Sequence, residues 1–104
     1  MNDRELLELA AKAAGIPLKP DFVDRFDYYM AVPLMWSPLT DDGDALRLAV
    51  KLRLQVTISE GDAMTTCYAE PMTSGESVDF MDDPDAATRR AIVRAAAEIG
   101  RMTR

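Results

Sequence analysis

Apolar residues recur at helical spacing in three separate segments of the chain. In residues 2–14 they repeat every three or four positions, which predicts an amphipathic helix. Asn2 and Glu5 suit a capping box at its start, and Gly15 stands where the helix should end. The first helix is therefore predicted with both of its ends defined by local sequence.

A second helix is predicted over residues 40–54, where acidic cap residues precede an apolar stripe. Leu46 and Val50 widen that stripe, so we expect this helix to be largely buried. A third helix is predicted from the cap Asp83 and Pro84, its first helical residue, to about residue 101. Its apolar face consists mostly of small residues, which favours close approach to a neighbouring helix.

Residues 54–59 alternate between apolar and polar side chains, which is typical of a strand with one buried face. The apolar side chains of that face are Leu54, Val56 and Ile58. A turn signal at 60–62 leads to a predicted returning strand over 64–70, and a short third strand is predicted over 77–81.

The most aromatic stretch of the chain, residues 21–38, is harder to interpret. A strand over 26–32 is predicted, and a helical turn over 22–28 is the alternative. Pro33 and Pro38 argue against a helix through the second half of the stretch.

In chain order, these segments predict an α+β fold in which three helices pack on a small, mostly antiparallel sheet of three to four strands. We expect the last helix to lie along the first or the second. A chain of 104 residues has room for one hydrophobic core, so residues 1–104 are expected to form a single domain. No apolar run reaches the roughly 18–20 residues that cross a bilayer, so no membrane association is expected.

The composition limits the chemistry that the chain can perform. It contains no histidine and one cysteine, Cys67. Histidine, the usual general base near neutral pH, is therefore missing. One cysteine without histidine can form neither a thiolate zinc site nor a Cys-His nucleophile. Cys67 is expected to be a small buried residue. The sequence predicts a protein that is not an enzyme and has no catalytic residue, metal site or cofactor.

The charge of the chain is acidic and unevenly distributed. Twelve basic and 18 acidic residues give a net charge of −6. Residues 86–104 hold five arginines and one acid, a charge of +4, which leaves −10 on residues 1–85. Such an acidic body repels phosphate, so direct nucleic-acid binding is not expected, whereas a basic patch on another protein would be attracted. The candidate binding residues are acids in or beside the predicted turns: Glu60, Asp62, Glu76, Asp79 and Asp82.

Trp36 is a further candidate binding residue. It lies in an apolar, proline-bounded run over residues 32–39. An exposed tryptophan in such a run would anchor a protein partner. The alternative, which we favour, is that Trp36 fills the core beside the second helix, since a small domain needs such large side chains inside.

Two charged clusters have a structural interpretation that we prefer to a functional one. The acids Asp41, Asp42 and Asp44 fit helix capping and lack the spacing of a calcium-binding loop. A row of arginines on the last helix could bind a phosphate backbone. Compensation of the helix dipole, together with an Arg94–Glu98 ion pair, explains the same arginines without a ligand.

Two segments of the chain resemble small phage and prophage proteins. They are WSPLTDDGDALRLAVKL over residues 36–52 and DPDAATRRAIVRAAAEIG over residues 83–100. With the first helix, the resemblance covers about half of the chain. It implies a phage or prophage setting and carries over no catalytic residue.

That setting favours a binding protein that inhibits a host protein or complex, in the manner of anti-CRISPR and other anti-defence proteins. Acids presented where nucleic acid would sit would be its means of binding. One alternative is a structural or recombination accessory protein of the phage, and another is a small-molecule or nucleotide binder that uses the aromatic segment 26–36. The expected location is the cytoplasm of the infected or lysogenic bacterial host, with a homodimer left open.

Overall fold

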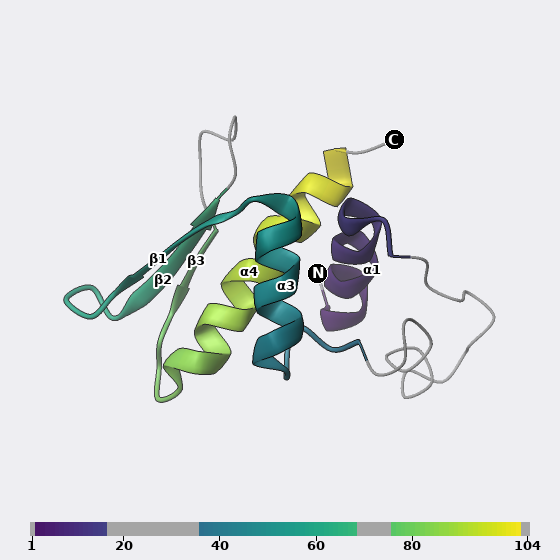
Figure 1. Cartoon of the computed structure of the whole chain (residues 1–104). Coiled ribbons are helices and arrows are strands. Elements are labelled where there is room, and N and C mark those ends of the chain that lie inside the picture. The colour runs from purple at the N-terminus through teal and green to yellow at the C-terminus, as the bar shows by residue number, and fades with distance from the viewer. Residues whose placement is uncertain (1, 17–35, 69–75, 103–104) are drawn as a thin grey trace.

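The computed structural model describes residues 2–16, 36–68 and 76–102 of the chain. In this part, three helices accompany one antiparallel sheet of strand order β1-β2-β3, which confirms the predicted α+β class (Figure 1). The elements in chain order are α1 (Asp3–Ala14), α3 (Asp42–Leu52), β1 (Gln55–Ser59), β2 (Met64–Tyr68), β3 (Glu76–Asp79) and α4 (Pro84–Met102). The strand predicted over 26–32, and its helical alternative, lie outside the described residues.

The ends of α1 are those that the sequence predicts. The Asn2 side chain accepts a hydrogen bond of 2.8 Å from the backbone N–H of Glu5, which otherwise has no partner in the first turn. Gly15 follows the last turn with a φ of 71°, a left-handed conformation that glycine adopts without steric cost. Its N–H donates to carbonyl groups of the last turn of α1.

The helix α3 is shorter than predicted. The backbone N–H groups of Thr40 and Asp41 donate to the Ser37 carbonyl, so residues 37–41 form a turn and the helix begins only after it. The Asp41 side chain caps α3 by accepting from the Asp44 N–H at 2.8 Å. At the other end, Arg53 takes a left-handed φ of 56° and stops the helix before β1.

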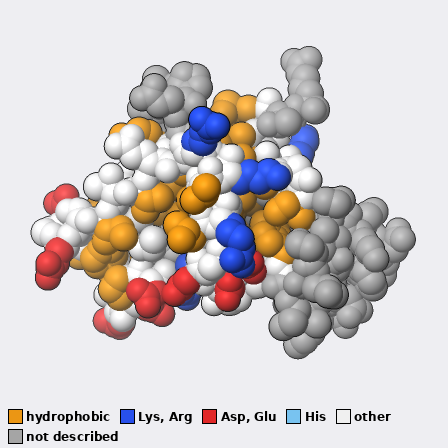
Figure 2. All heavy atoms as spheres, viewed as in Figure 1, with side chains coloured by type: hydrophobic (Ala, Val, Ile, Leu, Met, Phe, Trp, Pro, Cys, Tyr) orange, Lys and Arg blue, Asp and Glu red, His pale blue; other side chains and the backbone are white. Residues whose placement is uncertain are grey.

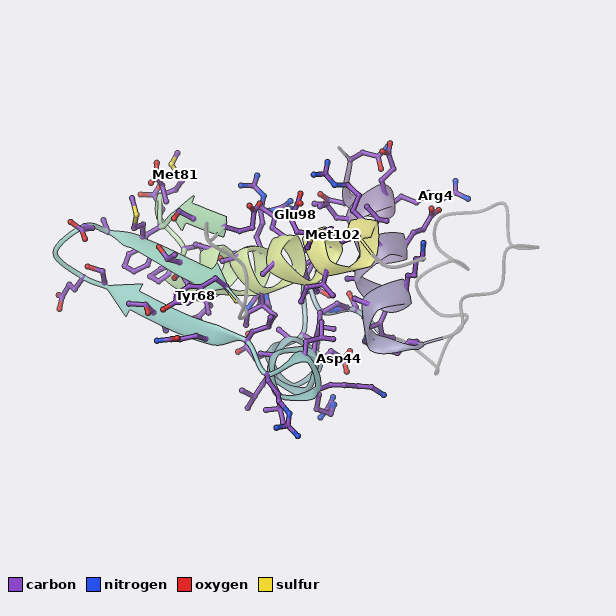
Figure 3. All side chains as sticks on the ribbon, turned by 90° about the horizontal axis from the view of Figure 1, so that it is seen from above. Arg4, Asp44, Tyr68, Met81, Glu98 and Met102 are labelled. Carbon is purple, nitrogen blue, oxygen red and sulfur yellow. The ribbon has the colours of Figure 1, made fainter. Side chains whose placement is uncertain are left out.

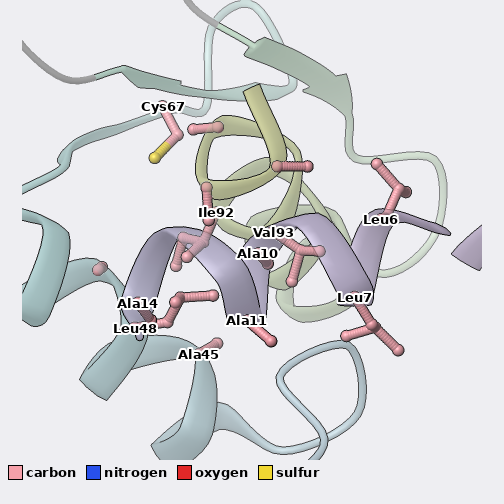
Figure 4. Packing of buried hydrophobic residues seen from close by; sticks show 14 of the residues in the cluster. Leu6, Leu7, Ala10, Ala11, Ala14, Ala45, Leu48, Cys67, Ile92 and Val93 are labelled. Atoms are coloured by element: carbon pink, nitrogen blue, oxygen red, sulfur yellow. The ribbon is translucent and has the colours of Figure 1, made fainter. Parts of the chain in front are cut away.

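The helix α4 lies at the centre of the fold. It begins at Pro84, and Asp83 caps it by accepting from the Ala86 N–H at 3.0 Å, as predicted. It packs against α1, α3, β2 and β3, and side chains from all of these regions meet in one core (Figures 1 and 4). No helix among the described residues combines the length and the apolar character that a membrane span requires.

Small residues allow α4 to approach α1 very closely. A Cβ atom added to Gly100 would lie only 1.9 Å from the carbonyl oxygen of Leu9 on α1. The small-residue face predicted for the last helix is thus used against the first helix, which is one of the two neighbours expected from the sequence.

The sheet covers α4 with one face. Thr65 and Cys67, alternate residues of the central strand β2, are fully buried, and the Thr65 hydroxyl makes a 2.9 Å hydrogen bond with the Thr88 hydroxyl of α4. Along β1, the predicted apolar face is only partly buried: Val56 is half-buried, whereas 59% of Ile58 is exposed. The reason is that β1 is an edge strand, while α4 packs on β2 and β3.

Candidate functional site: the acidic turn end of the sheet

Four of the five candidate acids lie at one end of the sheet, which we call the acidic turn end. Glu60 and Asp62 belong to the turn between β1 and β2, Asp79 is the last residue of β3, and Asp82 lies in the turn that follows. All four are exposed. They occur in two segments of the chain that the fold joins.

The strand register and one hydrogen bond bring these two segments together. Met64, the first residue of β2, is paired with Ser59 on one side and with Asp79 on the other. Beyond the strands, the Phe80 N–H donates to the Ala63 carbonyl at 2.8 Å. The two turns therefore lie at the same end of the sheet, where Figure 3 shows the β1–β2 loop and, beyond β3, Met81.

Glu76 is the exception among the five candidate acids. It is the first residue of β3 and is paired with Cys67, so it lies at the opposite end of the sheet. It is also only half-exposed. The structure thus separates Glu76 from the other four acids, because a strand places its first and last residues at opposite ends.

The acids of the turn end have no cationic partner in the described part of the chain. None of the ion pairs there involves Glu60, Asp62, Asp79 or Asp82. Residues 54–88 contain eight acids and neither lysine nor arginine, so no cation is available nearby in sequence. Among the described residues, the only side-chain hydrogen bond to these acids is from the Ser59 hydroxyl to Asp62, at 3.2 Å. Their negative charge faces solvent and contributes to the field at this end of the sheet.

Trp36 lies in the core. Only 7% of it is exposed, and it belongs to the cluster of buried apolar residues. This agrees with the interpretation of Trp36 as a core residue and leaves little of its surface for a partner. The other residues of the aromatic segment 26–36, which the small-molecule alternative requires, lie outside the described residues.

Cys67 is fully buried in β2, as predicted. Desolvation by burial raises the pKa of its thiol to about 12, so the thiol stays protonated at neutral pH. A protonated, inaccessible thiol is a poor nucleophile. Among the described residues, no group of three or more histidine, cysteine, aspartate or glutamate side chains is placed to hold a metal ion.

The acids at the start of α3 have structural partners. Asp41 is the helix cap, and Asp44 accepts from the Ser37 N–H at 2.8 Å and from Arg47 at 2.7 Å. Asp42 forms an ion pair with Arg89 of α4, with 2.6 Å between the carboxylate oxygen and the guanidinium nitrogen. This agrees with the structural interpretation of the cluster.

Three arginines of α4, Arg89, Arg90 and Arg101, likewise have partners within the molecule. Arg89 also donates from Nε to the Leu39 carbonyl at 3.0 Å, and Arg90 makes two hydrogen bonds to the Asp3 carboxylate of α1. The predicted Arg94–Glu98 pair is wrong: Glu98 pairs with Arg101 at 3.0 Å. A spacing of three residues brings side chains together on a helix as well as a spacing of four does.

The sequence analysis missed an apolar groove. Leu46 and Val50 were expected to extend the buried stripe of α3, yet they are 63% and 68% exposed. The expectation failed because only one narrow side of α3 contacts α4. Between the exposed side and β1 lies a groove of about 290 Å³, whose apolar walls include Ala45, Leu46, Ala49, Val56, Ile58 and Ile92.

In comparisons with known proteins, no family model, curated protein or solved structure matches this chain. The resemblance of residues 36–52 and 83–100 to phage proteins therefore stays a prediction.

Proposed function

We propose that the protein is a non-enzymatic binding protein, encoded by a phage or prophage, that inhibits a host protein or complex through the acidic turn end of the sheet. The observation that carries this proposal is the group of exposed acids Glu60, Asp62, Asp79 and Asp82, which form no ion pair with any residue that the structure describes. The partner is a protein whose basic surface ordinarily binds nucleic acid.

Free acids suit this role better than paired ones would. A carboxylate already held in an ion pair gains little from a second cation and must give up the first. The acids of the turn end pair with no cation in residues 2–16, 36–68 and 76–102, so they can contact the lysines and arginines of a phosphate-binding groove directly. The resulting complex excludes nucleic acid by occupying the groove and by repelling phosphate.

The acids of the turn end also attract a basic partner before the two proteins come into contact. Like-signed charges grouped on one edge steer a basic partner into position and raise the association rate, an effect that salt screens. The net charge of −6 strengthens this attraction to a basic partner. Neutralising the acids is therefore expected to slow association more than it accelerates dissociation.

The experiment compares two variants with the same change in net charge. One carries Glu60→Gln and Asp62→Asn in the turn end, and the control carries Glu5→Gln and Glu8→Gln, two exposed acids of α1. Wild type and both variants are used to capture proteins from host lysate, with quantitative mass spectrometry. The association rate and its salt dependence are then measured for the captured protein.

We expect wild type and control to capture a nucleic-acid-handling protein that the turn-end variant retains poorly. The association rate of the turn-end variant is expected to fall about tenfold at low salt, and nucleic acid should compete with the wild-type protein for the partner. Equal capture by both variants, or binding that nucleic acid does not affect, would refute the proposal. Melting temperatures of the variants separate lost binding from lost folding.

A further inference from the structure

The exposed side of α3 carries an apolar ridge formed by Leu46 and Val50. These residues are four positions apart, so their side chains lie one above the other on the same side of the helix. They are 63% and 68% exposed, although a solvent-facing helix side is ordinarily polar. In Figure 2, hydrophobic side chains lie in the centre of the face that α3 and β1 form.

The groove lies directly beside this ridge. Its α3 wall includes Ala45 and Ala49, whose short side chains leave the hollow, and its opposite wall includes Val56 and Ile58 of β1. Leu46 belongs both to the ridge and to the rim of the groove. The ridge and the groove therefore run next to each other along α3. A surface of this kind is complementary to itself under a two-fold rotation, which lays each ridge in the groove of the other copy.

The charges along α3 fit the same rotation. The helix has acids in its first turn, including Asp42, whereas Lys51 lies in its last turn and Arg53 follows it. Asp42 is already paired with Arg89, so the acid that remains available at this end of the groove is Asp85 of α4, which lines it. A two-fold rotation about an axis perpendicular to α3 makes the two helices antiparallel, so that the basic end of one copy meets the acidic end of the other. Within the described part of the chain, Lys51, Arg53 and Asp85 take no part in an ion pair.

We propose that this face binds a second copy of the chain, with the two α3 helices antiparallel and each Leu46–Val50 ridge seated in the groove of the partner. Charge complementarity between the two ends of α3 selects this occupant, because the same surface supplies both signs. The opposite helix dipoles also favour the antiparallel arrangement. The proposal does not depend on the acidic turn end, which lies outside the ridge and the groove.

The first test measures the oligomeric state by sedimentation equilibrium from low to high micromolar concentration. Wild type is expected to be dimeric at the upper end of this range. Leu46→Glu places a charge in the contact and is expected to raise the dissociation constant of the dimer at least about tenfold. The matched control is Met102→Glu at the C-terminal end of α4, which is 65% exposed and lies outside the groove (Figure 3). This control is expected to dimerise like wild type.

The second test examines the antiparallel orientation with a charge reversal. Lys51→Glu and Lys12→Glu each remove the basic residue from the last turn of a helix, so both lose the same interaction with the helix dipole. Only Lys51→Glu sets two acidic ends against each other, and it is expected to weaken the dimer about threefold to tenfold more than the control does.

Three results would overturn the proposal. The first is a wild-type protein that stays monomeric over the whole range, which would leave the groove to another occupant. The second is equal dimerisation of wild type and Leu46→Glu. The third is equal weakening by Lys51→Glu and Lys12→Glu, which would exclude the antiparallel pairing. Dimerisation that persists in the Glu60→Gln/Asp62→Asn variant while host binding is lost would show that the two surfaces act separately.

Discussion

The helices and the sheet use their acidic residues in opposite ways. On the helical side, Asp41 and Asp83 cap helix ends, and other acids pair with arginines, as Asp42 does with Arg89 and Asp3 with Arg90. At the turn end of the sheet, the acids are exposed and have no cation in the described part of the chain. The same residue type therefore stabilises the fold in one region and remains available for a partner in the other. Substitutions with a matched control in the other region test this difference.

The largest effect is expected from adding one methyl group between α1 and α4. Gly100→Ala would place Cβ 1.9 Å from the Leu9 carbonyl oxygen, so the helices must separate. We expect a loss of about 3 kcal/mol in the free energy of unfolding, seen as a fall of roughly 12–24 °C in the melting temperature. The control, Gly61→Ala in the turn between β1 and β2, meets no atom within 4 Å and should melt near wild type. A melting temperature for Gly100→Ala within a few degrees of wild type would show that the close contact is wrong.

A smaller effect is expected at the contact between the sheet and α4, where the pKa of Cys67 is raised from 9.0 to about 12. Between these values the thiol loses its proton in the unfolded state and keeps it in the folded state. The stability is therefore complete below pH 9 and falls as the pH rises towards 12, by about 1.4 kcal/mol per pH unit. Urea unfolding of wild type and Cys67→Ala between pH 8 and 11 measures this slope. Because the variant lacks the thiol, parallel slopes in the two proteins would rule out the linkage.

The smallest effect compares two neighbouring acids at the boundary between the regions. Asp83→Ala removes the cap of α4 and is expected to cost about 1 kcal/mol. Asp82→Ala removes an exposed acid that pairs with no cation among the described residues, and it should change the stability by less than about 0.5 kcal/mol. Chemical denaturation of both variants gives the comparison. Equal losses would contradict the division into structural acids and free acids.

The sequence predicted most of what depends on neighbouring residues. The caps Asn2 and Asp83 and the stop at Gly15 are where local hydrogen bonding and glycine geometry require them. The strands β1, β2 and β3 begin within a residue of their predicted starts. The fold class could be predicted from these elements, because three helices with apolar stripes and a few short alternating strands can form one core in only a few ways.

What the sequence did not predict depends on contacts between distant segments. Leu46 and Val50 fit an apolar stripe, but whether a wide stripe is buried depends on how many elements pack against it. The pair between Arg89 and Asp42 spans 47 positions and leaves no local signal. For the candidate site, the exposure of the acids could be predicted because they lie in or beside predicted turns. That Glu76 lies apart from the other four acids could be known only from the register of β2 and β3.

The central position of α4 has a consequence for synthesis on the ribosome. The segments before it, including α1 and β2, bury their apolar faces against it, so those faces have no native partner until residues 84–102 have been made. The hydrogen bonds between Asp3 and Arg90 close a loop of 87 positions, and such distant contacts slow folding. During translation the early segments are therefore open to chaperones and proteases, and the stable core forms in one late step.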